Sequence, residues 1–389
     1  EYQELTLSLH TTMSCMLSGA RRWASTLARR RVIVSGIQPT GVPHLGNYLG
    51  ALKTWTALQN EADPQDELYF FIASLHALTI PQNPKQLYHD RRNLLAALIA
   101  VGLDPHRCTI FMQDQVPQHA ELSWLLMCQS PFGRLERMTT WKSKIATIQN
   151  SASEDHVNES QLQLGLFAYP VLQTADILMY HATHVPVGED QQQHLELTRD
   201  LAHSFNRSVK KPFFPIPEAL LSESKRILSL RNPEQKMSKS APDANSRIML
   251  TDTPEQIQSK VKKAVTDSEG TLSFDPASRP AISNLLQILA GMDGGVLQSH
   301  MTQEITQERK DPAFLARFLN EYAGGSSAAL KRTLADSIIE ELRPVQKEYS
   351  RLISEDGFLD EIERLGREKA CIRAQETMSQ VRTMLGLHQ

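Results

Sequence analysis

The chain has 389 residues, of which 41% are hydrophobic and 22% charged, and this composition is that of an ordinary soluble enzyme with two or three domains. Its formal net charge of −3 at pH 7 excludes a general polyanion binder, so contact with nucleic acid must come from local basic patches. The longest apolar stretch, residues 94–103, is too short to cross a bilayer, and we predict no membrane association.

The first 31 residues differ in composition from the rest of the chain. No Asp or Glu occurs between Leu5 and Asn60. Arginines are concentrated here, at Arg21, Arg22, Arg29, Arg30 and Arg31. An arginine-rich leader with hydroxylated residues and no acids is typical of a mitochondrial transit peptide, and a disordered basic tail is the alternative. We therefore predict a transit peptide over residues 1–31 and a location in the mitochondrial matrix.

Three short apolar segments are predicted to be strands, at residues 31–35, 68–73 and 109–112. A glycine- and proline-rich loop, residues 36–46, follows the first of them, and helices are expected at 47–60 and 85–102. Strands that alternate with helices indicate parallel βαβ units and a sheet of the nucleotide-binding type.

The pattern changes twice in the second half of the chain. A polar, mostly acidic run at 151–163 is typical of an exposed insertion. Strands are then predicted at 184–187 and 227–230, with a helix at about 190–205 between them. Beyond residue 250 apolar positions recur at helical spacing, as at Leu330, Leu334, Ile338, Leu342 and Val345. We expect an α/β parallel-sheet domain over residues 32–250 and an α-helical domain over 251–389.

The cysteines offer no sign of a metal centre. They lie far apart and form no CxxC pair, at positions Cys15, Cys108, Cys128 and Cys371. This spacing argues against a disulfide framework, a structural zinc site and an iron–sulfur cluster. We expect reduced, mostly buried thiols and no metal held by the protein.

A first candidate for nucleotide binding is the segment SGIQPTGVPHLGN, residues 35–47. Its glycines let the backbone approach a ligand closely, and the start of the following helix is an anion site. His44 and Asn47, one helical turn apart, can both reach phosphates. A plain connecting loop is the alternative interpretation.

The second candidate is the pentapeptide KMSKS, residues 236–240. Lys236 and Lys239, on a flexible loop, can move onto a triphosphate as charge develops toward the leaving pyrophosphate. A solvated lysine-rich loop is the weaker alternative.

Together, HLGN (residues 44–47) and KMSKS resemble the paired signatures of class I aminoacyl-tRNA synthetases. Asn47 replaces the second histidine of the usual HIGH pattern, as is common in the tryptophan and tyrosine branch. The resemblance implies a Rossmann-like catalytic domain that binds ATP with Mg²⁺, with catalytic roles for His44, Asn47, Lys236 and Lys239. It implies ATP contacts for a larger set of residues: Gln38, Pro39, Thr40, Gly46, Asn47, Gly188, Glu189, Asp190, Ile227, Lys236, Met237, Ser238, Lys239 and Ser240.

Three further segments point to tryptophan. The run GEDQQQHLELTRD (residues 188–200), with SGIQPTG and AVTDSEG (264–270), is similar to segments of tryptophanyl-tRNA synthetases, and the resemblance extends over residues 32–387. A specific indole pocket needs a buried acceptor for the single N–H, because an unpaired acceptor costs about 1–3 kcal/mol and so rejects phenylalanine.

The indole pocket is predicted on one face of the helix that carries Tyr169, Gln173 and Asp176. Asp176 matches the family's indole acceptor, and Tyr169 and Gln191 match residues at the ammonium and carboxylate end of the amino acid. Gln173 stands where many relatives have methionine, so the acceptor role stays open between Gln173 and Asp176. Ordinary helix packing is the alternative for this face.

One departure from the family pattern lies after the second predicted strand. His76 belongs to a Ser-Leu-His triplet that replaces the more usual Asp-x-His, which leaves the role of that strand end open. Lys144 resembles a family lysine that reaches the ATP phosphates, and a surface lysine is the alternative interpretation.

The resemblance also implies partners. These are L-tryptophan, tRNA(Trp) and a second copy of the chain in a homodimer, with the helical domain over 251–389 as the anticodon-binding domain. Basic residues on its approach, Lys260, Lys262 and Lys263, are expected to face the tRNA. A tyrosine-specific enzyme of the same branch and a non-catalytic RNA-binding relative are the rival functions.

We predict that the leader directs import and is then cleaved. A fluorescent fusion of residues 13–35 should therefore accumulate in mitochondria, as seen by microscopy with a matrix marker. A fusion that stays in the cytosol would show that this segment is only a basic tail.

Overall fold

The computed structural model describes residues 30–139, 141, 162–188, 191–221, 226–293, 308–322, 324–355 and 357–387. Several predictions fall outside these residues: the leader up to residue 29, Lys144, nearly all of the 151–163 insertion, and the two acidic residues Glu189 and Asp190.

The core of the N-terminal half is one parallel sheet of five strands. Its strands are β1 (Val32–Ile37), β2 (Glu67–Ile72), β3 (Thr109–Met112), β4 (His184–Val187) and β5 (Glu218–Leu221). Their order is β3-β2-β1-β4-β5, so the chain reverses direction across the sheet next to β1. This doubly wound arrangement confirms the predicted Rossmann-like α/β fold. Because the strands are parallel, all their carboxyl ends meet at one edge of the sheet, where such folds bind ligands.

The prediction of a last strand at residues 227–230 is wrong. Leu228 forms only an isolated antiparallel bridge with Lys236, and the fifth strand is β5 instead. Ile227 and Leu230 are apolar because they are buried in the core, at 3% and 2% exposure, and not because they pair with the sheet. A four-residue segment with three apolar side chains cannot distinguish these two situations.

Helices cover the sheet on both faces. They are α2 (Leu45–Asn47), the π-helix η1 (Tyr48–Leu52), α3 (Lys53–Glu61), α4 (Ser74–Ala77), α5 (Pro84–Ala100), α6 (Gln118–Met127), α7 (Phe132–Glu136), α9 (Leu164–Met179) and α10 (Gln192–Ser208). α5 begins where the sequence favours it, since Asn83 accepts hydrogen bonds from the first-turn N–H groups and Pro84 occupies the first helical position.

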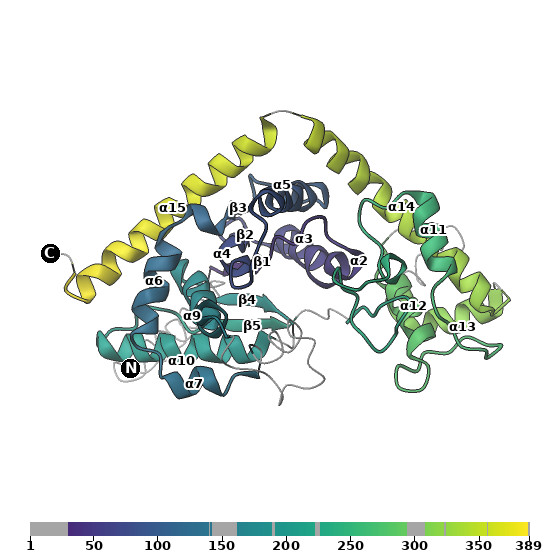
Figure 1. Cartoon of the computed structure of the whole chain (residues 1–389), viewed down its shortest axis with the longest axis horizontal. Coiled ribbons are helices and arrows are strands. Elements are labelled where there is room, and N and C mark those ends of the chain that lie inside the picture. Colours follow the sequence, from purple (N-terminus) through teal and green to yellow (C-terminus); the bar gives the residue numbers. More distant parts are fainter. Residues whose placement is uncertain are drawn as a thin grey trace, which may run out of the picture.

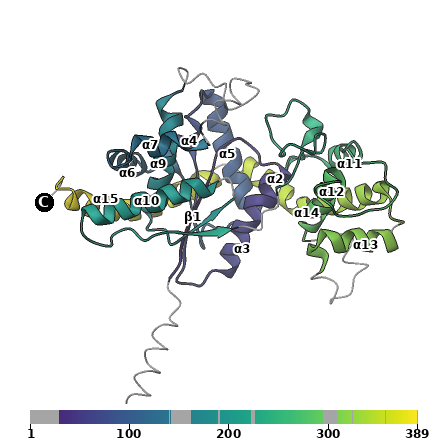
Figure 2. The same cartoon turned by 90° about the horizontal axis from the view of Figure 1, so that it is seen from below.

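The C-terminal half is helical, as predicted. Its helices are α11 (Pro254–Lys262), α12 (Pro280–Ala290), α13 (Pro312–Tyr322), α14 (Ser327–Ser354) and α15 (Phe358–Met384). α11 to α14 lie together on one side of the sheet in both views (Figures 1 and 2). The predicted apolar face of α14 is buried, with Leu330, Leu334, Ile338 and Leu342 at 0% exposure. Among the described helices, none combines the length and apolarity that a bilayer crossing requires.

The last helix, α15, returns from the helical half to the sheet (Figure 1). It packs against β3 and α6, and Thr377 Oγ1 donates a hydrogen bond to the Met179 carbonyl at 2.8 Å. The closest approach is at Gly366, where an added Cβ would lie 1.7 Å from the Ile110 carbonyl oxygen. The C-terminal segment is therefore part of the support of the sheet.

A second connection between the halves lies beside the π-helix. Glu341 of α14 accepts hydrogen bonds from Tyr48 Oη and Lys53 Nζ, both at 2.9 Å, and from the Asp293 N–H at 2.8 Å. Lys53 also donates to the Gly291 carbonyl at 2.7 Å. Tyr48 directly follows Asn47, so this network ties the helix of the first motif to the C-terminal helices.

We predict that Gly366→Ala destabilises the protein by about 2–3 kcal/mol, because the methyl group must displace a backbone carbonyl. Gly165→Ala is the matched control, since a Cβ there meets nothing within 4 Å and should be neutral or stabilising by up to about 1 kcal/mol. Urea unfolding of both variants measures the difference. Equal stability of the two would contradict the close packing of α15 on β3.

Candidate active site

The first motif places His44 at the start of α2, with its side chain turned to its own helix. His44 Nδ1 accepts from the Asn47 N–H at 3.3 Å, and Asn47 Oδ1 accepts from the His44 N–H at 3.1 Å. Because Nδ1 is an acceptor, the ring proton of a neutral His44 resides on Nε2, which can donate to a phosphate oxygen.

His44 is a neutral imidazole at neutral pH and not a cation. Burial, and then the positive charges of Lys239, Lys236 and Arg247, lower the pKa of His44 to about 4. At neutral pH the imidazole is uncharged, so the positive charge of the site comes from the lysines around it.

A short backbone clasp joins the loop of the first motif to the chain that follows the second. The Leu45 N–H donates to the Ile248 carbonyl at 2.8 Å, and the Leu250 N–H donates to the Pro43 carbonyl at 3.0 Å. Gly46 keeps this region close-packed, because an added Cβ would lie 3.0 Å from the His44 ring and 3.5 Å from Met237 Cβ. The two motifs are thus held side by side.

The lysine loop meets the first motif directly. Lys239 Nζ donates to the Thr40 carbonyl at 2.5 Å and lies 3.2 Å from Thr40 Oγ1. Met237, 2% exposed, anchors the loop in the core, and its N–H donates to the Ile227 carbonyl at 3.0 Å. Burial lowers the pKa of Lys239 to about 8; Arg247 adds to this effect and Asp90 opposes it.

A cleft of about 550 Å³ opens between these loops and the helix α9, at the carboxyl edge of the sheet. Its lining includes nine of the predicted contact residues: Gln38, Thr40, Asn47, Tyr169, Gln173, Asp176, Gly188, Gln191 and Lys236. The predicted nucleotide and amino-acid residues therefore share one cavity.

Eight other predicted residues do not line the cleft. These are Pro39, His44, Gly46, Ile227, Met237, Ser238, Lys239 and Ser240. Ile227 is the clearest case, since its side chain is buried in the core and only its carbonyl is directed to the lysine loop.

Asp176 is completely buried and is surrounded by three donor residues, of which only His76 was singled out from the sequence, with its role left open. It accepts hydrogen bonds from His76 Nε2 at 2.7 Å, Gln113 Nε2 at 2.7 Å and His119 Nδ1 at 2.6 Å. Burial raises the pKa of Asp176, but the hydrogen bonds from His119 and His76 outweigh it and lower the pKa to about 2. The carboxylate is ionised, and three donors leave about one of its four lone-pair sites for a ligand.

The partners of Asp176 come from distant parts of the chain. Gln113 directly follows β3 and His76 lies in α4, just after β2, so both are at the carboxyl edge of the sheet. His119 Nε2 in turn faces Tyr180 Oη at 2.8 Å. The position of a polar residue directly after a predicted strand was the available signal for Gln113 and His76, whereas nothing local indicated His119.

A second polar chain lies on the neighbouring wall. Gln173 Nε2 donates to Gln191 Oε1 at 3.3 Å, and His194 Nδ1 lies 2.8 Å from the same oxygen. His194 Nε2 is 3.2 Å from Tyr169 Oη. The three predicted tryptophan contacts Tyr169, Gln173 and Gln191 are thus oriented together, with His194 as the residue that prediction missed.

The chain matches a family of known enzymes. Residues 26–343 match the family model of class I tRNA synthetases (W and Y). The chain is 41% identical to the mitochondrial tryptophan–tRNA ligase of Saccharomyces cerevisiae, covering 94% of this chain and 97% of that protein. It is 42% identical to the tryptophan–tRNA ligase of Rickettsia conorii, covering 92% and 99%.

Solved structures of tryptophanyl-tRNA synthetases are similar to this chain in fold. The tryptophanyl-tRNA synthetase of Mycoplasma pneumoniae superposes with a TM-score of 0.78 at 31% identity, covering 92% of this chain and 99% of that one. That of Campylobacter jejuni, complexed with ADP and tryptophan, gives 0.69 at 28% identity, covering 92% and 99%.

We predict that Lys239→Ala lowers the rate of tryptophan-dependent ATP–pyrophosphate exchange about 100-fold, because a cation beside the phosphates is lost. Tryptophan binding, measured by calorimetry, should survive.

In the parent protein kcat/KM for ATP should fall as pH rises above about 8, where Lys239 loses its proton. The variant Lys239→Arg should move this loss of activity to higher pH. Lys85→Ala, at an exposed position on α5, is the control, and unchanged exchange in Lys239→Ala would remove this lysine from the mechanism.

Proposed function

Since this chain belongs to the class I tRNA synthetases for tryptophan and tyrosine, we propose that it is a ligase that joins L-tryptophan to tRNA(Trp). The observation that carries this proposal is the single cleft, with the two phosphate-handling loops on one wall and the Asp176 pocket on the other. ATP and an aromatic amino acid can therefore meet in one site.

The first step is attack of the tryptophan carboxylate on the α-phosphorus of ATP. A carboxyl oxygen–phosphorus bond forms, the bond to the leaving pyrophosphate breaks, and no base is required because the carboxylate is already ionised. His44 Nε2 and Asn47 donate hydrogen bonds, while Lys236 and Lys239 stabilise the negative charge that develops toward pyrophosphate. In the second step a ribose hydroxyl at the 3′ end of the tRNA displaces AMP.

Magnesium is proposed to arrive with the nucleotide. Among the described residues no group of three or more His, Cys, Asp or Glu side chains could hold a metal ion. The cleft offers cations and neutral donors near the phosphate side, so the triphosphate itself supplies the oxygen ligands that Mg²⁺ prefers and the ion shields phosphate charge.

Selection of the amino acid is assigned to Asp176. Its carboxylate is held in place by His76, Gln113 and His119, and one lone-pair site is left for the indole N–H. A phenylalanine ring would leave that site unpaired. Tyrosine could also donate to Asp176, so the choice of tryptophan rests on the similarity to tryptophan ligases along nearly the whole chain.

Contact with tRNA is proposed for the helical half, with one change from the sequence-based prediction. Lys260 is occupied by a salt bridge with Asp252, at 2.5 Å, and its side chain is only 12% exposed. Lys262 and Lys263 are exposed at the end of α11 and remain candidates for phosphate contacts.

We extend the proposal to the location of the protein and to its oligomeric state. A site of action in the mitochondrial matrix is supported by the leader composition and by the mitochondrial relatives of two yeasts. A homodimer is supported by large apolar side chains that stay exposed on α6, α7 and α9: Trp124 at 66%, Phe132 at 68% and Leu164 at 78%.

The decisive experiment is pyrophosphate exchange with tryptophan or tyrosine. Tryptophan should support exchange at least 100-fold more efficiently, and Asp176→Asn should lower the tryptophan efficiency about 10- to 100-fold through loss of the charged acceptor. Asp200→Asn, at a surface ion pair with Arg134, is the matched control. Faster exchange with tyrosine would identify a tyrosine enzyme, and no exchange at all would favour a non-catalytic relative.

A further inference from the structure

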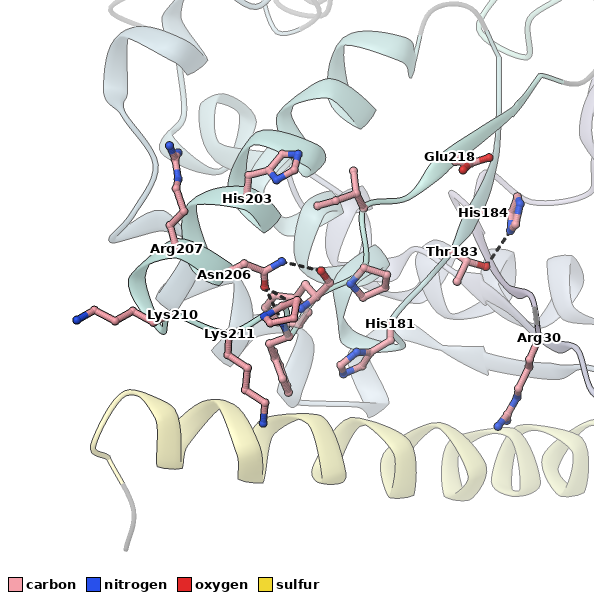
Figure 3. A pocket seen from close by; sticks show the side chains of 15 residues that line it. Arg30, His181, Thr183, His184, His203, Asn206, Arg207, Lys210, Lys211 and Glu218 are labelled. Carbon is pink, nitrogen blue, oxygen red and sulfur yellow. Dashed lines mark hydrogen bonds between the residues drawn. The ribbon is translucent and has the colours of Figure 1, made fainter. Parts of the chain in front are cut away.

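A basic groove lies at the amino edge of the sheet, opposite the catalytic cleft. We use this name for the hollow of about 870 Å³ shown in Figure 3, between the end of α10, the segment 210–216, and the starts of β4 and β5. Arg30, just before β1, closes its other side. Since the strands are parallel, a ligand here is separated from the ATP cleft by the length of the sheet.

The groove concentrates positive charge on a chain that is negative as a whole. Its lining has four permanent cations (Arg30, Arg207, Lys210 and Lys211) against the single carboxylate of Glu218, a formal charge of +3. The whole chain has −3. A hollow with this local potential attracts anions even though the protein does not.

Three of the cations have no partner in the part of the chain that the structure describes. Arg30 pairs with Glu67, whereas Arg207, Lys210 and Lys211 are exposed and form no ion pair there. The same surface includes His184 and His203. Unpaired cations gathered at one place are free to neutralise phosphates.

The wall that presents these cations is held by hydrogen bonds. Asn206 Oδ1 accepts from the N–H groups of Phe213 and Phe214 at 3.0 and 2.9 Å, and its Nδ2 donates to the Phe214 carbonyl at 2.8 Å (Figure 3). Lys210 has a φ of +52°, a conformation that would suit glycine or asparagine better. The turn therefore presents a lysine at a position where a small residue would cost less.

The directions of the side chains suit an extended ligand. Arg207, Lys210 and Lys211 spread away from one another around the end of α10 in Figure 3. One small anion could contact only some of these three cations, whereas successive phosphates of a nucleic-acid chain could contact each of them.

We propose that the basic groove binds the phosphodiester backbone of RNA, at a site distinct from the catalytic cleft. The proposal draws on the tRNA ligase function only for the identity of the RNA, which is taken to be the substrate tRNA. Such contacts fix position and add affinity without reading sequence.

Other occupants fit less well. A membrane surface would need exposed apolar side chains to insert, but Phe213 and Phe214 are buried, at 8% and 2%, and Ile216 is only 36% exposed. The chain's own first 29 residues include three arginines and two glutamates, so their net charge is positive and the groove repels them.

The test is tRNA binding by fluorescence anisotropy over a range of salt concentrations. The triple variant Arg207→Gln, Lys210→Gln, Lys211→Gln should bind tRNA about tenfold more weakly at low salt, and the slope of log K against log salt should be smaller by about 2. Pyrophosphate exchange needs no tRNA and should be unchanged. If the parent protein shows no pyrophosphate exchange, the proposed function fails. If exchange is intact and the triple variant binds tRNA as tightly as the parent, only the proposal for the basic groove fails.

The matched control removes three exposed cations that do not line the groove: Lys85→Gln, Arg367→Gln, Lys369→Gln. This control variant should retain the parent's affinity for tRNA and its slope of log K against log salt. The charge-conserving variant Arg207→Lys, Lys210→Arg, Lys211→Arg should restore binding, which a merely structural role would not predict. If that variant also binds weakly, the groove acts through its shape and the proposal fails.

Two further experiments distinguish RNA from other ligands of the groove. Inorganic phosphate at 10-fold molar excess over the tRNA phosphates should compete only weakly, because a single anion cannot occupy the whole groove. Strong competition would indicate a small-anion site instead. Binding to vesicles of phosphatidylglycerol that the triple variant loses, with unaltered tRNA binding, would assign the surface to a membrane and overturn the proposal.

Discussion

Two backbone hydrogen bonds, from Leu45 to Ile248 and from Leu250 to Pro43, hold the catalytic arrangement together. They join segments about two hundred residues apart, so their formation fixes the relative position of both phosphate-handling loops. In this arrangement Met237 packs beside Gly46 and Lys239 reaches Thr40. Backbone groups make the clasp, so it constrains the loops whatever rotamers the side chains adopt. The lysines can then move toward a nucleotide while the base of the loop remains in place.

Charge in the cleft is arranged by burial and by hydrogen bonding. His44 is kept neutral by burial and by the nearby positive charges, and its Nδ1 accepts from the Asn47 N–H, so its Nε2 carries the proton and is a possible donor. Asp176 is the opposite case, because a fully buried carboxylate stays ionised when several donors surround it. The donors that stabilise the carboxylate also fix its direction. A selective pocket needs such a fixed acceptor, since a mobile one could turn to whichever ring was present.

The parallel sheet separates two kinds of chemistry. Its carboxyl edge has the cleft, which is lined by the predicted nucleotide and amino-acid residues. Its amino edge has the basic groove, which is lined by cations and which we propose for a long polyanion. The C-terminal half connects to this framework at two places, to the helix after the first motif through Glu341 and to the sheet through α15 against β3 (Figure 1). Glu341 therefore links the helical half to the helix that follows His44 and Asn47.

The sequence by itself determined four of the five strands, the helical C-terminal half and the two loop motifs that the structure brings together. These are local signals: apolar runs, helical spacing, glycine-rich turns and short contiguous motifs. Only the tertiary structure decided that residues 218–221 complete the sheet and that residues 227–230 do not, because strand pairing depends on a neighbour and not on apolarity. The same holds for the ring of His76, Gln113 and His119 around Asp176, whose members lie 57 to 100 residues from it. The basic groove likewise unites Arg30 with the end of α10, since parallel strands bring their amino ends to one edge. Contacts between residues so far apart have no local signature, and the chain must fold before they exist.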